Sequence, residues 1–305
     1  MAADVSLVAE RRFRAMGTDA HVVVNGPEAE ASLDVAIARV GDLERRWSRF
    51  LQDSEICRLN ARAGSPTVVS TDTFGLIEKA VFAWQVTAGA FDPMMLAALE
   101  ELGYDAPFDS LSADPARLGH VAPKASGGAG AVELDRASQT VCLPLGAAFD
   151  PGGIGKGLAA DLVSGELIAR GAWGAMVNLG GDLRVRGVPP DGLEWVVSVR
   201  EPAVAPTTLA TLRLQDAGVA TSTTLRRRWA AIDGPRHHLL DPRTSRPHRD
   251  GADLCTVVAG EAWWAEVCAT ASVGLEPDAL PNHSSLRVFS DGRRELHGSF
   301  EGHTF

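Results

Sequence analysis

Three β-rich runs in the second half of the chain constrain its fold most strongly. They cover residues 175–178, 195–200 and 208–214, and the turns between them are too short for helical crossovers. Parallel neighbours need a crossover of about a dozen residues or more, so we expect these strands to pair antiparallel. Helical patterns are interspersed irregularly. The sequence therefore favours an α+β fold, with mixed, largely antiparallel sheets and packed helices, over a doubly wound parallel sheet.

Amphipathic helices are predicted on both sides of these strands. Apolar residues follow helical spacing in four segments, 28–47, 71–88, 158–170 and 262–274. The stretch "DSEICRLN" is typical of a short capped helix, and "HVVV" closed by "NGP" predicts an early strand within residues 13–25. We expect one domain over residues 1–305. The segment 105–134, rich in Pro, Ala, Gly and Ser, could be a flexible connection between two lobes of it.

Composition narrows the class of protein. A hydrophobic content of 45% supports a sizeable core, and a net charge of -10 argues against nucleic acid as a partner. The basic run 226–228 is typical of a solvated face. No apolar run predicts a membrane span or a secretory signal, so we expect a cytoplasmic protein. The 4 cysteines form no CxxC pair, which favours buried free thiols over a zinc or redox site.

The stretch "DPGGIGKGLAAD", residues 150–161, places four glycines and Lys156 ahead of a helical pattern. Glycines let a backbone approach a ligand closely, and the N–H groups at a helix N-terminus attract anions. The stretch is not a P-loop, because Gly157 stands where a hydroxyl residue would hold magnesium. Phosphate binding, metal binding and a simple tight turn all remain open from these residues alone.

Other patterns have both a functional and a structural interpretation. Glu266 and Thr270 are four residues apart, so they share one helix face and could offer oxygen ligands to Mg²⁺, or form a surface pair. In "HHLLDPRTSRP" a histidine could take a proton from an attacking hydroxyl, or serve as a structural hydrogen-bonding group. Asp92 in "GAFDP" could bind a ligand or simply form a turn. In "NLGGDLRVRG" the glycine pair predicts a hairpin turn with Asp182 as a local cap.

In their order along the chain, these patterns resemble one family. The stretches are "FRAMGTDAHV", "RWSRFLQDSEICRLN", "TAGAFDP", "DPGGIGKGLAAD", "NLGGDLRVRG", "VATSTT", "HHLLDPRTSRP" and "AEVCATASVG". Together they span residues 13–274, and they resemble the ApbE family of FAD:protein FMN transferases. The resemblance implies a Mg²⁺-dependent enzyme that binds FAD and moves its FMN portion to a threonine of an acceptor flavoprotein, with release of AMP.

The resemblance also implies roles for individual residues. His238 is implied as the general base. A contact with Mg²⁺ is implied for the backbone oxygen of Gly153 and for the side chains of Glu266 and Thr270. A contact with FAD is implied for Met16, Phe50, Ala90, Phe91, Asp92, Asp150, Lys156 and Leu240. Displacing AMP from a pyrophosphate requires the charge on the phosphate oxygens to be neutralised, and a metal ion together with Lys156 would do so.

The chain departs from the family pattern at a few positions. Glu266 stands where the family usually has aspartate, "ATSTT" replaces the usual "ATSG", and Ser245 replaces a glycine that adopts positive φ without strain. Two other functions use the same residues. They are Mg²⁺-dependent hydrolysis of FAD to FMN and AMP, and binding of FAD without catalysis. A nicotinamide oxidoreductase is disfavoured, because the glycine loop has no βαβ context.

Overall fold

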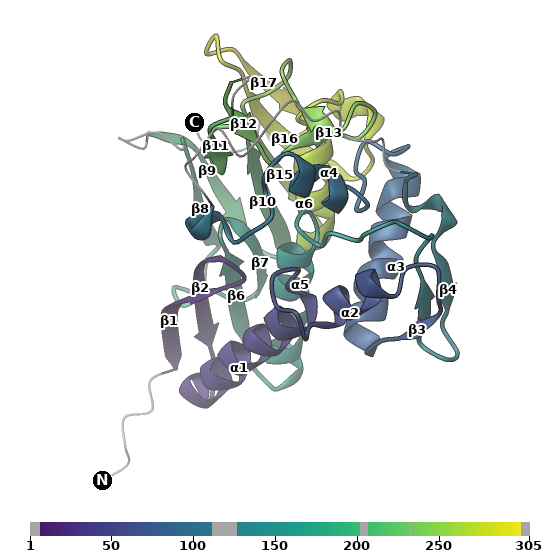
Figure 1. Cartoon of the computed structure of the whole chain (residues 1–305). Coiled ribbons are helices and arrows are strands. Elements are labelled where there is room, and N and C mark those ends of the chain that lie inside the picture. Colours follow the sequence, from purple (N-terminus) through teal and green to yellow (C-terminus); the bar gives the residue numbers. More distant parts are fainter. Residues whose placement is uncertain (1–6, 112–126, 202–206, 232–233, 300–305) are drawn as a thin grey trace.

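A computed structural model of the chain describes residues 7–111, 127–201, 207–231 and 234–299. Its largest sheet has 8 strands (Figure 1). Their order across the sheet is β1 (Val8–Ala15), β2 (Thr18–Asn25), β6 (Gly174–Leu179), β7 (Asp182–Gly187), β10 (Ala217–Thr223), β15 (Leu254–Ala259), β16 (His283–Val288) and β17 (Arg294–His297). In the described part of the chain, each ladder of this sheet is antiparallel, as predicted.

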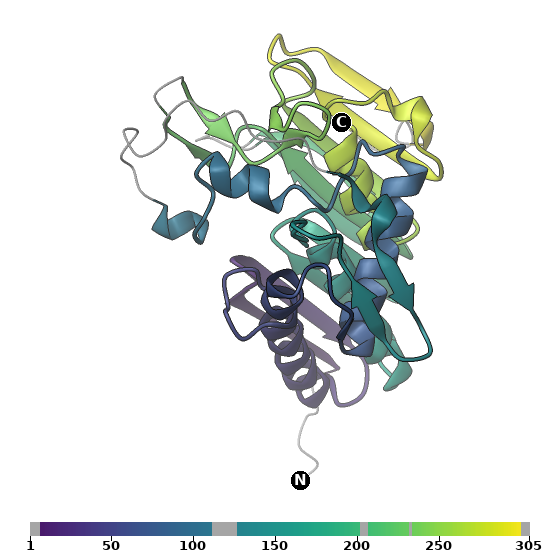
Figure 2. The same ribbon diagram turned by 45° about the vertical axis from the view of Figure 1, so that its right-hand side comes forward.

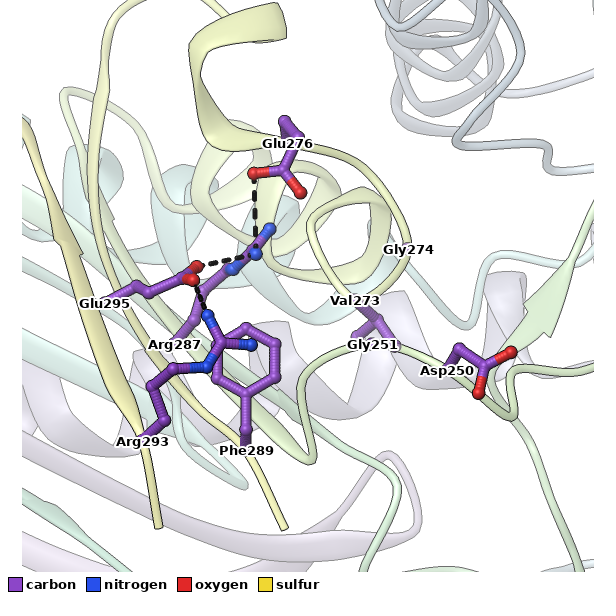
Figure 3. A pocket seen from close by; sticks show the side chains of 9 residues that line it. All are labelled: Asp250, Gly251, Val273, Gly274, Glu276, Arg287, Phe289, Arg293 and Glu295. Carbon is purple, nitrogen blue, oxygen red and sulfur yellow. Dashed lines mark hydrogen bonds and ion pairs between the residues drawn. The ribbon is translucent and has the colours of Figure 1, made fainter. Parts of the chain in front are cut away.

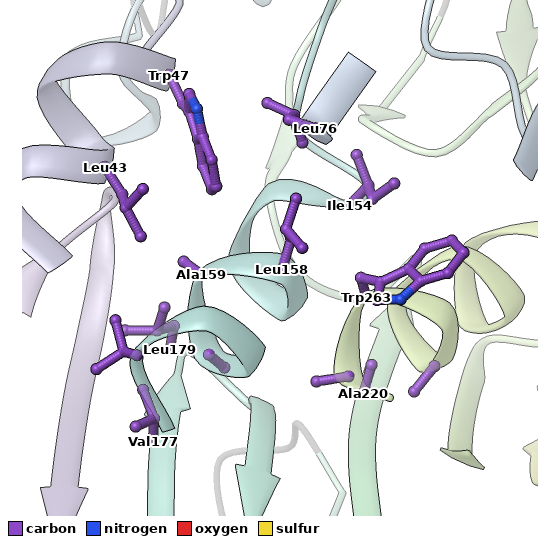
Figure 4. Packing of buried hydrophobic residues seen from close by; sticks show 14 of the residues in the cluster. Leu43, Trp47, Leu76, Ile154, Leu158, Ala159, Val177, Leu179, Ala220 and Trp263 are labelled. Carbon is purple, nitrogen blue, oxygen red and sulfur yellow. The ribbon is translucent and has the colours of Figure 1, made fainter. Parts of the chain in front are cut away.

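Helices form a layer on one face of this sheet. They are α1 (Ala29–Trp47), α5 (Gly155–Ala169) and α6 (Ala262–Ala271), and their apolar residues share one core with the sheet (Figure 4). Alternation along the strands supplies that core. Val22 and Val24 of β2 contribute to it, whereas Val23 belongs to a second core on the opposite face. One strand thus serves two layers.

The second core is covered by a hairpin. Strands β8 (Trp195–Arg200) and β9 (Thr208–Leu214) pair antiparallel and bury their apolar residues together with those of β7, β10, β15 and β16. Trp195 and Leu212 of the hairpin are buried against Val185 and Val219 of the large sheet. The bounds of both strands agree with the predicted ranges. The α+β prediction is therefore confirmed, with the large sheet lying between a helical layer and a β-hairpin.

A smaller unit flanks the helical layer. Figure 2 shows α3 (Thr71–Val86) beside the three-stranded sheet β3-β5-β4. The remaining helices and strands are α2 (Glu55–Ala61), β3 (Thr67–Val68), α4 (Leu96–Glu101), β4 (Glu133–Asp135), β5 (Thr140–Cys142), β11 (Arg228–Trp229), β12 (Arg236–His237), β13 (Leu240–Asp241) and β14 (Arg246–Pro247). Short 3₁₀ turns lie at Phe108–Ser110, Ala129–Ala131 and Pro277–Ala279. The predicted connection at 105–134 lies partly outside the described residues, and the division into lobes stays a prediction.

Some local predictions need correction. The range 13–25 holds parts of two strands, because Met16 and Gly17 both have positive φ and form the turn between β1 and β2. Helix α5 begins at Gly155 rather than at Leu158, so Lys156 lies in its first turn. The predicted short helix is confirmed as α2, which Ser54 caps by accepting a hydrogen bond from the N–H of Cys57 at 3.0 Å.

Two further predictions concern the cysteines and membrane-spanning helices. The 4 cysteines are free, but only Cys255 and Cys268 are buried, whereas Cys57 and Cys142 are half-buried. Among the described residues, none of the helices is both long and apolar enough to cross a lipid bilayer.

Candidate active site

The "DPGGIGKGLAAD" stretch forms a turn at residues 152–154 and then enters a helix, where close packing requires Gly157. None of Gly152, Gly153, Gly155 and Gly157 has positive φ. A Cβ atom on Gly157 would lie 2.4 Å from the carbonyl oxygen of Ala262, the first residue of α6. The first turn of α5 therefore lies directly against the beginning of α6, and this contact brings the two motifs together.

The most buried charges of the site meet at Lys156. Its ammonium forms ion pairs with Glu266 of α6 and, at 2.5 Å, with Asp182 of β7. The other carboxylate oxygen of Glu266 accepts a hydrogen bond from the backbone N–H of Gly157 at 2.8 Å. Glu266 is only 2% exposed, so the alternative of a surface pair with Thr270 is wrong. The three side chains form one cluster of an ammonium and two carboxyl groups.

Mutual attraction keeps Lys156 charged, whereas burial makes the charged form of Glu266 less favourable. Burial lowers the pKa of Lys156, but the negative charges of Asp182 and Glu266 outweigh burial and hold that pKa above its usual value. Burial raises the pKa of Glu266, and the nearby charge of Asp182 raises it further against the opposing effect of Lys156. A cation bound beside Glu266 would favour its charged form, so the carboxyl group can act as a ligand once it is deprotonated.

A hydroxyl group adjoins this cluster. Thr270 follows Glu266 by one helical turn, and its Oγ1 lies 3.3 Å from the Oγ of Ser222 and about 3.5 Å from where a Cβ on Gly153 would be. Gly153, Glu266 and Thr270 are therefore brought to one place, as the resemblance implies. Carboxylate, hydroxyl and carbonyl oxygens are the ligands that Mg²⁺ prefers, and Mg²⁺ takes only one or two carboxylates from a protein. Among the described residues, no group of three or more acidic, His or Cys side chains is arranged so that it could hold a metal ion by itself.

The "TAGAFDP" stretch forms a bend against the glycine loop. Ala88 and Gly89 have positive φ, and Phe91 is buried with its ring edge 3.0 Å from where a Cβ on Gly153 would be. Ala90 is half-buried against the same core. Asp92 accepts a hydrogen bond from the N–H of Met94 at 2.9 Å, which is the turn geometry that the sequence left open.

At the start of the glycine stretch, the side chain of Asp150 forms a hydrogen bond with the backbone two residues further on. Its Oδ1 accepts a hydrogen bond from the N–H of Gly152 at 3.0 Å and lies 3.7 Å from the Nε of Arg49. Arg49 also contacts Phe50, with its guanidinium carbon 4.3 Å from the ring centroid. Phe50 and Leu240 in turn pack against an apolar cluster of Leu99, Leu102, Tyr104 and Trp229. The motifs that contain Phe50 and Leu240 thus pack against the same apolar cluster.

The two histidines of "HHLLDP" have different surroundings. His237 lies on β12 and makes local contacts, because its Nε2 is 2.9 Å from the carbonyl oxygen of His248. The Nδ1 of His238 is buried without a hydrogen-bond partner. Burial lowers the pKa of His238 well below its usual value, and the positive charges of Arg227, His237 and Lys156 lower it further. His238 is therefore a neutral imidazole within the electrostatic field of the Lys156 cluster.

Met16 lies in a turn that neighbours the turn before Asp182. The turn between β6 and β7 consists of Gly180 and Gly181, both with positive φ, and confirms the predicted hairpin. A Cβ on Gly180 would collide with the side chain of Thr18, so the Met16–Gly17 turn lies beside the turn that precedes Asp182. The structure gives no direct contact between Met16 and the Lys156 cluster.

Sequence reasoning missed several residues of this site. Asp182 was expected only as a local cap, yet it pairs with Lys156. Arg227 was expected on a solvated face, yet its charge acts on both Lys156 and His238. Arg49 and Tyr104 were not singled out. The position of Asp182 directly after a glycine pair at a strand start was the one local signal available.

A separate pocket of about 280 Å³ lies away from these residues (Figure 3). Its charged side chains neutralise one another, because Arg287 pairs with Glu295 at 2.7 Å and with Glu276 at 3.5 Å, and Arg293 also pairs with Glu295. None of the predicted site residues lines it. The candidate active site is therefore the region around Lys156.

Comparison with known proteins gives a consistent result. The family model described as the ApbE family matches residues 16–286. The FAD:protein FMN transferase of Treponema pallidum is 30% identical over 295 residues, which cover 87% of this chain and 79% of that protein. The enzyme of the same description from Klebsiella pneumoniae is 32% identical over 256 residues, with 80% and 77% covered.

Solved structures agree in fold. The ApbE protein of Thermotoga maritima superposes with a TM-score of 0.86 at 25% identity, and the match covers 98% of this chain and 99% of that chain. The flavin transferase ApbE of Vibrio cholerae superposes with a TM-score of 0.79 at 22% identity, covering 97% and 99%.

Proposed function

The chain belongs to the ApbE family and is an FAD:protein FMN transferase, and from this we propose that it transfers FMN from FAD to a threonine of an acceptor flavoprotein, with Mg²⁺. In this reaction a bond forms between the threonine Oγ and the phosphorus of the FMN phosphate. The bond from that phosphorus to the AMP oxygen breaks, and AMP leaves with the electron pair. The hydroxyl proton must go to a base.

The observation that carries this proposal is the charge cluster at the start of α5. Lys156 lies between Glu266 and Asp182, beside Gly153 and Thr270 and within the electrostatic field that acts on His238. Transfer of a phosphoryl group depends mainly on positioning the reactants and neutralising charge. A half-buried ammonium beside oxygen donors, with a neutral imidazole within its electrostatic field, supplies the groups that this chemistry requires.

His238 suits the role of general base because it is neutral. Its lowered pKa keeps the imidazole unprotonated at pH 7, and its buried Nδ1 has no partner within the protein. A base must be deprotonated to accept the proton of the attacking hydroxyl. The neighbouring positive charges of Lys156 and Arg227 act on the same region, where negative charge develops on the phosphate oxygens.

The residues expected to hold Mg²⁺ suit that ion chemically. The proposed ligands are Glu266, Thr270 and the backbone oxygen of Gly153, all oxygen donors close to the ion pair of Lys156 with Asp182. When bound, Mg²⁺ would neutralise charge on the phosphate oxygens of FAD. Lys156 already contacts one carboxylate oxygen of Glu266, so the residue contributes to both the ion pair and the proposed metal site.

The flavin end of FAD is proposed to occupy the aromatic side of the site. Phe50 and Leu240 are half-buried there, Phe91 is buried behind Gly153, and Asp150 accepts a hydrogen bond from the N–H of Gly152. Water must be kept from the reacting phosphate, because otherwise FAD would be hydrolysed to FMN and AMP. The same arrangement could support hydrolysis only if water replaced the threonine.

Incubation with FAD, Mg²⁺ and a threonine-bearing acceptor peptide tests the proposal, with the matching valine peptide as the control. We expect covalent flavin fluorescence on the threonine peptide only, together with AMP. Release of AMP with free FMN, independent of the peptide, would identify a hydrolase instead. Bound FAD without AMP would identify a protein that binds flavin without catalysis.

A further inference from the structure

Arg49 is a buried cation that none of the roles above uses. It follows α1 in the chain, and its side chain is only 6% exposed. Its guanidinium carbon lies 4.3 Å from the ring centroid of Phe50 and 4.5 Å from that of Tyr104. Contacts of a guanidinium with two aromatic rings hold it in a defined orientation, because both the ring faces and the guanidinium are rigid.

The hydrogen-bond donors of Arg49 are only partly used. Nη1 donates to the carbonyl oxygen of Tyr104 at 3.0 Å, and Nε lies 3.7 Å from a carboxylate oxygen of Asp150, which is longer than a hydrogen bond. Nη2 is buried and has no hydrogen-bond partner. A buried donor without a partner costs stability, so its presence calls for an acceptor that binds there.

The neighbours of Arg49 indicate what that acceptor is. Phe50 and Asp150, which lie on two sides of it, are both expected to contact FAD. The ring of Tyr104 also lies 5.5 Å from that of Trp229, at a tilt of 34°, and Phe50 and Leu240 pack on the same apolar cluster. Phe50 and Leu240 are only half-buried on this cluster, so part of their apolar surface is open to a planar aromatic ring. The donor of Arg49 therefore lies at the edge of a site for a flat ligand.

Charge favours a carbonyl over a phosphate as the acceptor. The charge of Arg49 is already balanced by Asp150, whereas the Lys156 cluster is the site proposed for phosphate. A fixed N–H in the plane of a guanidinium matches a ring carbonyl, which accepts in its own plane. We propose that Nη2 of Arg49 donates a hydrogen bond to a carbonyl oxygen of the isoalloxazine ring of FAD and so positions the flavin. This inference rests on the proposed function only in taking FAD as the substrate.

Equilibrium binding of riboflavin and of ADP to Arg49→Met tests the inference without an acceptor or turnover. Losing a hydrogen bond from a charged donor should weaken riboflavin and FAD binding roughly 10- to 100-fold and leave ADP binding unchanged. Arg45→Met on the exposed side of α1 is the matched control and should bind all three ligands normally. A loss of ADP affinity with normal riboflavin affinity, or no change for any ligand, would overturn the assignment.

Flavin analogues test the same contact in the unaltered protein, in case Arg49→Met does not fold. Sulfur is a poorer acceptor than oxygen, so either 2-thioriboflavin or 4-thioriboflavin should bind more weakly than riboflavin, and Arg49→Met should reduce that difference. Equal affinity of all three for the unaltered protein would contradict the inference. Riboflavin binding that depends on Arg49 supports the proposed hydrogen bond even if no transfer to threonine is detected. The result therefore distinguishes failure of this inference from failure of the proposed function.

Discussion

Glu266 accepts a hydrogen bond from the backbone N–H of Gly157 at 2.8 Å, although 109 residues separate them in the chain. The bond joins α6 to the first turn of α5, and it is possible because Gly157 has no Cβ to hold the two helices apart. The same carboxylate pairs with Lys156. Binding chemistry and helix packing thus depend on the same few residues.

Replacing Glu266 with glutamine is expected to impair both stability and Mg²⁺ use. Lys156 would keep only Asp182 as a partner, and breaking one side of a buried ion pair costs about 3 kcal/mol. Denaturant unfolding and Mg²⁺-dependent AMP release measure the two effects. Glu276→Gln, at a side chain 82% exposed, should change neither; a Glu266→Gln enzyme with normal stability and Mg²⁺ response would contradict this account.

Two glycines of the same helix should respond in opposite ways to alanine. In Gly157→Ala the new methyl group would overlap the backbone of Ala262, so we expect a loss of about 1–3 kcal/mol in unfolding free energy. Gly165→Ala points into open space and should gain about 0.5–1 kcal/mol from helix propensity. Equal effects in thermal or denaturant unfolding would show that the close packing at Gly157 does not limit stability.

The lowered pKa of His238 predicts where activity is lost on the acid side of the pH–rate profile. Burial and nearby positive charges lower its pKa, so it stays neutral at and below its ordinary value of 6.5. Activity that needs a neutral base should therefore persist below pH 6.5 and fall only as pH drops through the lowered pKa. His238→Asn should reduce kcat/KM by about 10²–10⁴-fold. An unchanged rate in His238→Asn would remove His238 from the mechanism.

The raised pKa of Asp161 predicts how the free energy of unfolding varies with pH. This buried residue accepts hydrogen bonds from the N–H groups of Ala262 and Trp263, and burial raises its pKa from 3.8 to about 6. Between these values the folded protein keeps a proton that the unfolded chain loses. The stabilisation that this protonated carboxyl group adds to the free energy of unfolding is therefore fully present below pH 3.8. It falls by up to about 3 kcal/mol as pH rises through 6.

Comparing Asp161→Asn with the unaltered protein isolates this effect. Denaturant unfolding at several pH values between 4 and 7 should show a difference in stability between the two proteins that changes with pH. A constant difference over this range would mean that Asp161 does not titrate there.

Local patterns predicted much of the fold. The helices that begin after Ser54 and Ser70 start at those caps, and strands β8 and β9 have the predicted bounds. Caps and periodicity act within a few residues, so they can be read from sequence. Strand β1 was missed as a separate element because its exposed edge is rich in charged residues, and its partner pairing sets its position.

The structure brings together residues that the sequence motifs singled out, and it adds neighbours that only packing places beside them. Lys156, Gly153, Glu266 and Thr270 lie in family patterns, and the structure brings them together. Asp182 and Arg49 act through contacts with residues far away in the chain, and no local pattern indicates such a contact. The glycine stretch illustrates both cases: its position was clear, but the reason for Gly157 is the backbone of Ala262.

The most direct test of the central claim is the ratio of AMP released to FMN covalently bound to the acceptor threonine. Nucleotide chromatography and intact-mass measurement of the acceptor determine the two quantities in one reaction with FAD and Mg²⁺. Transfer to threonine predicts about one AMP for each FMN attached. AMP accumulating with free FMN while the acceptor stays unmodified would contradict the claim.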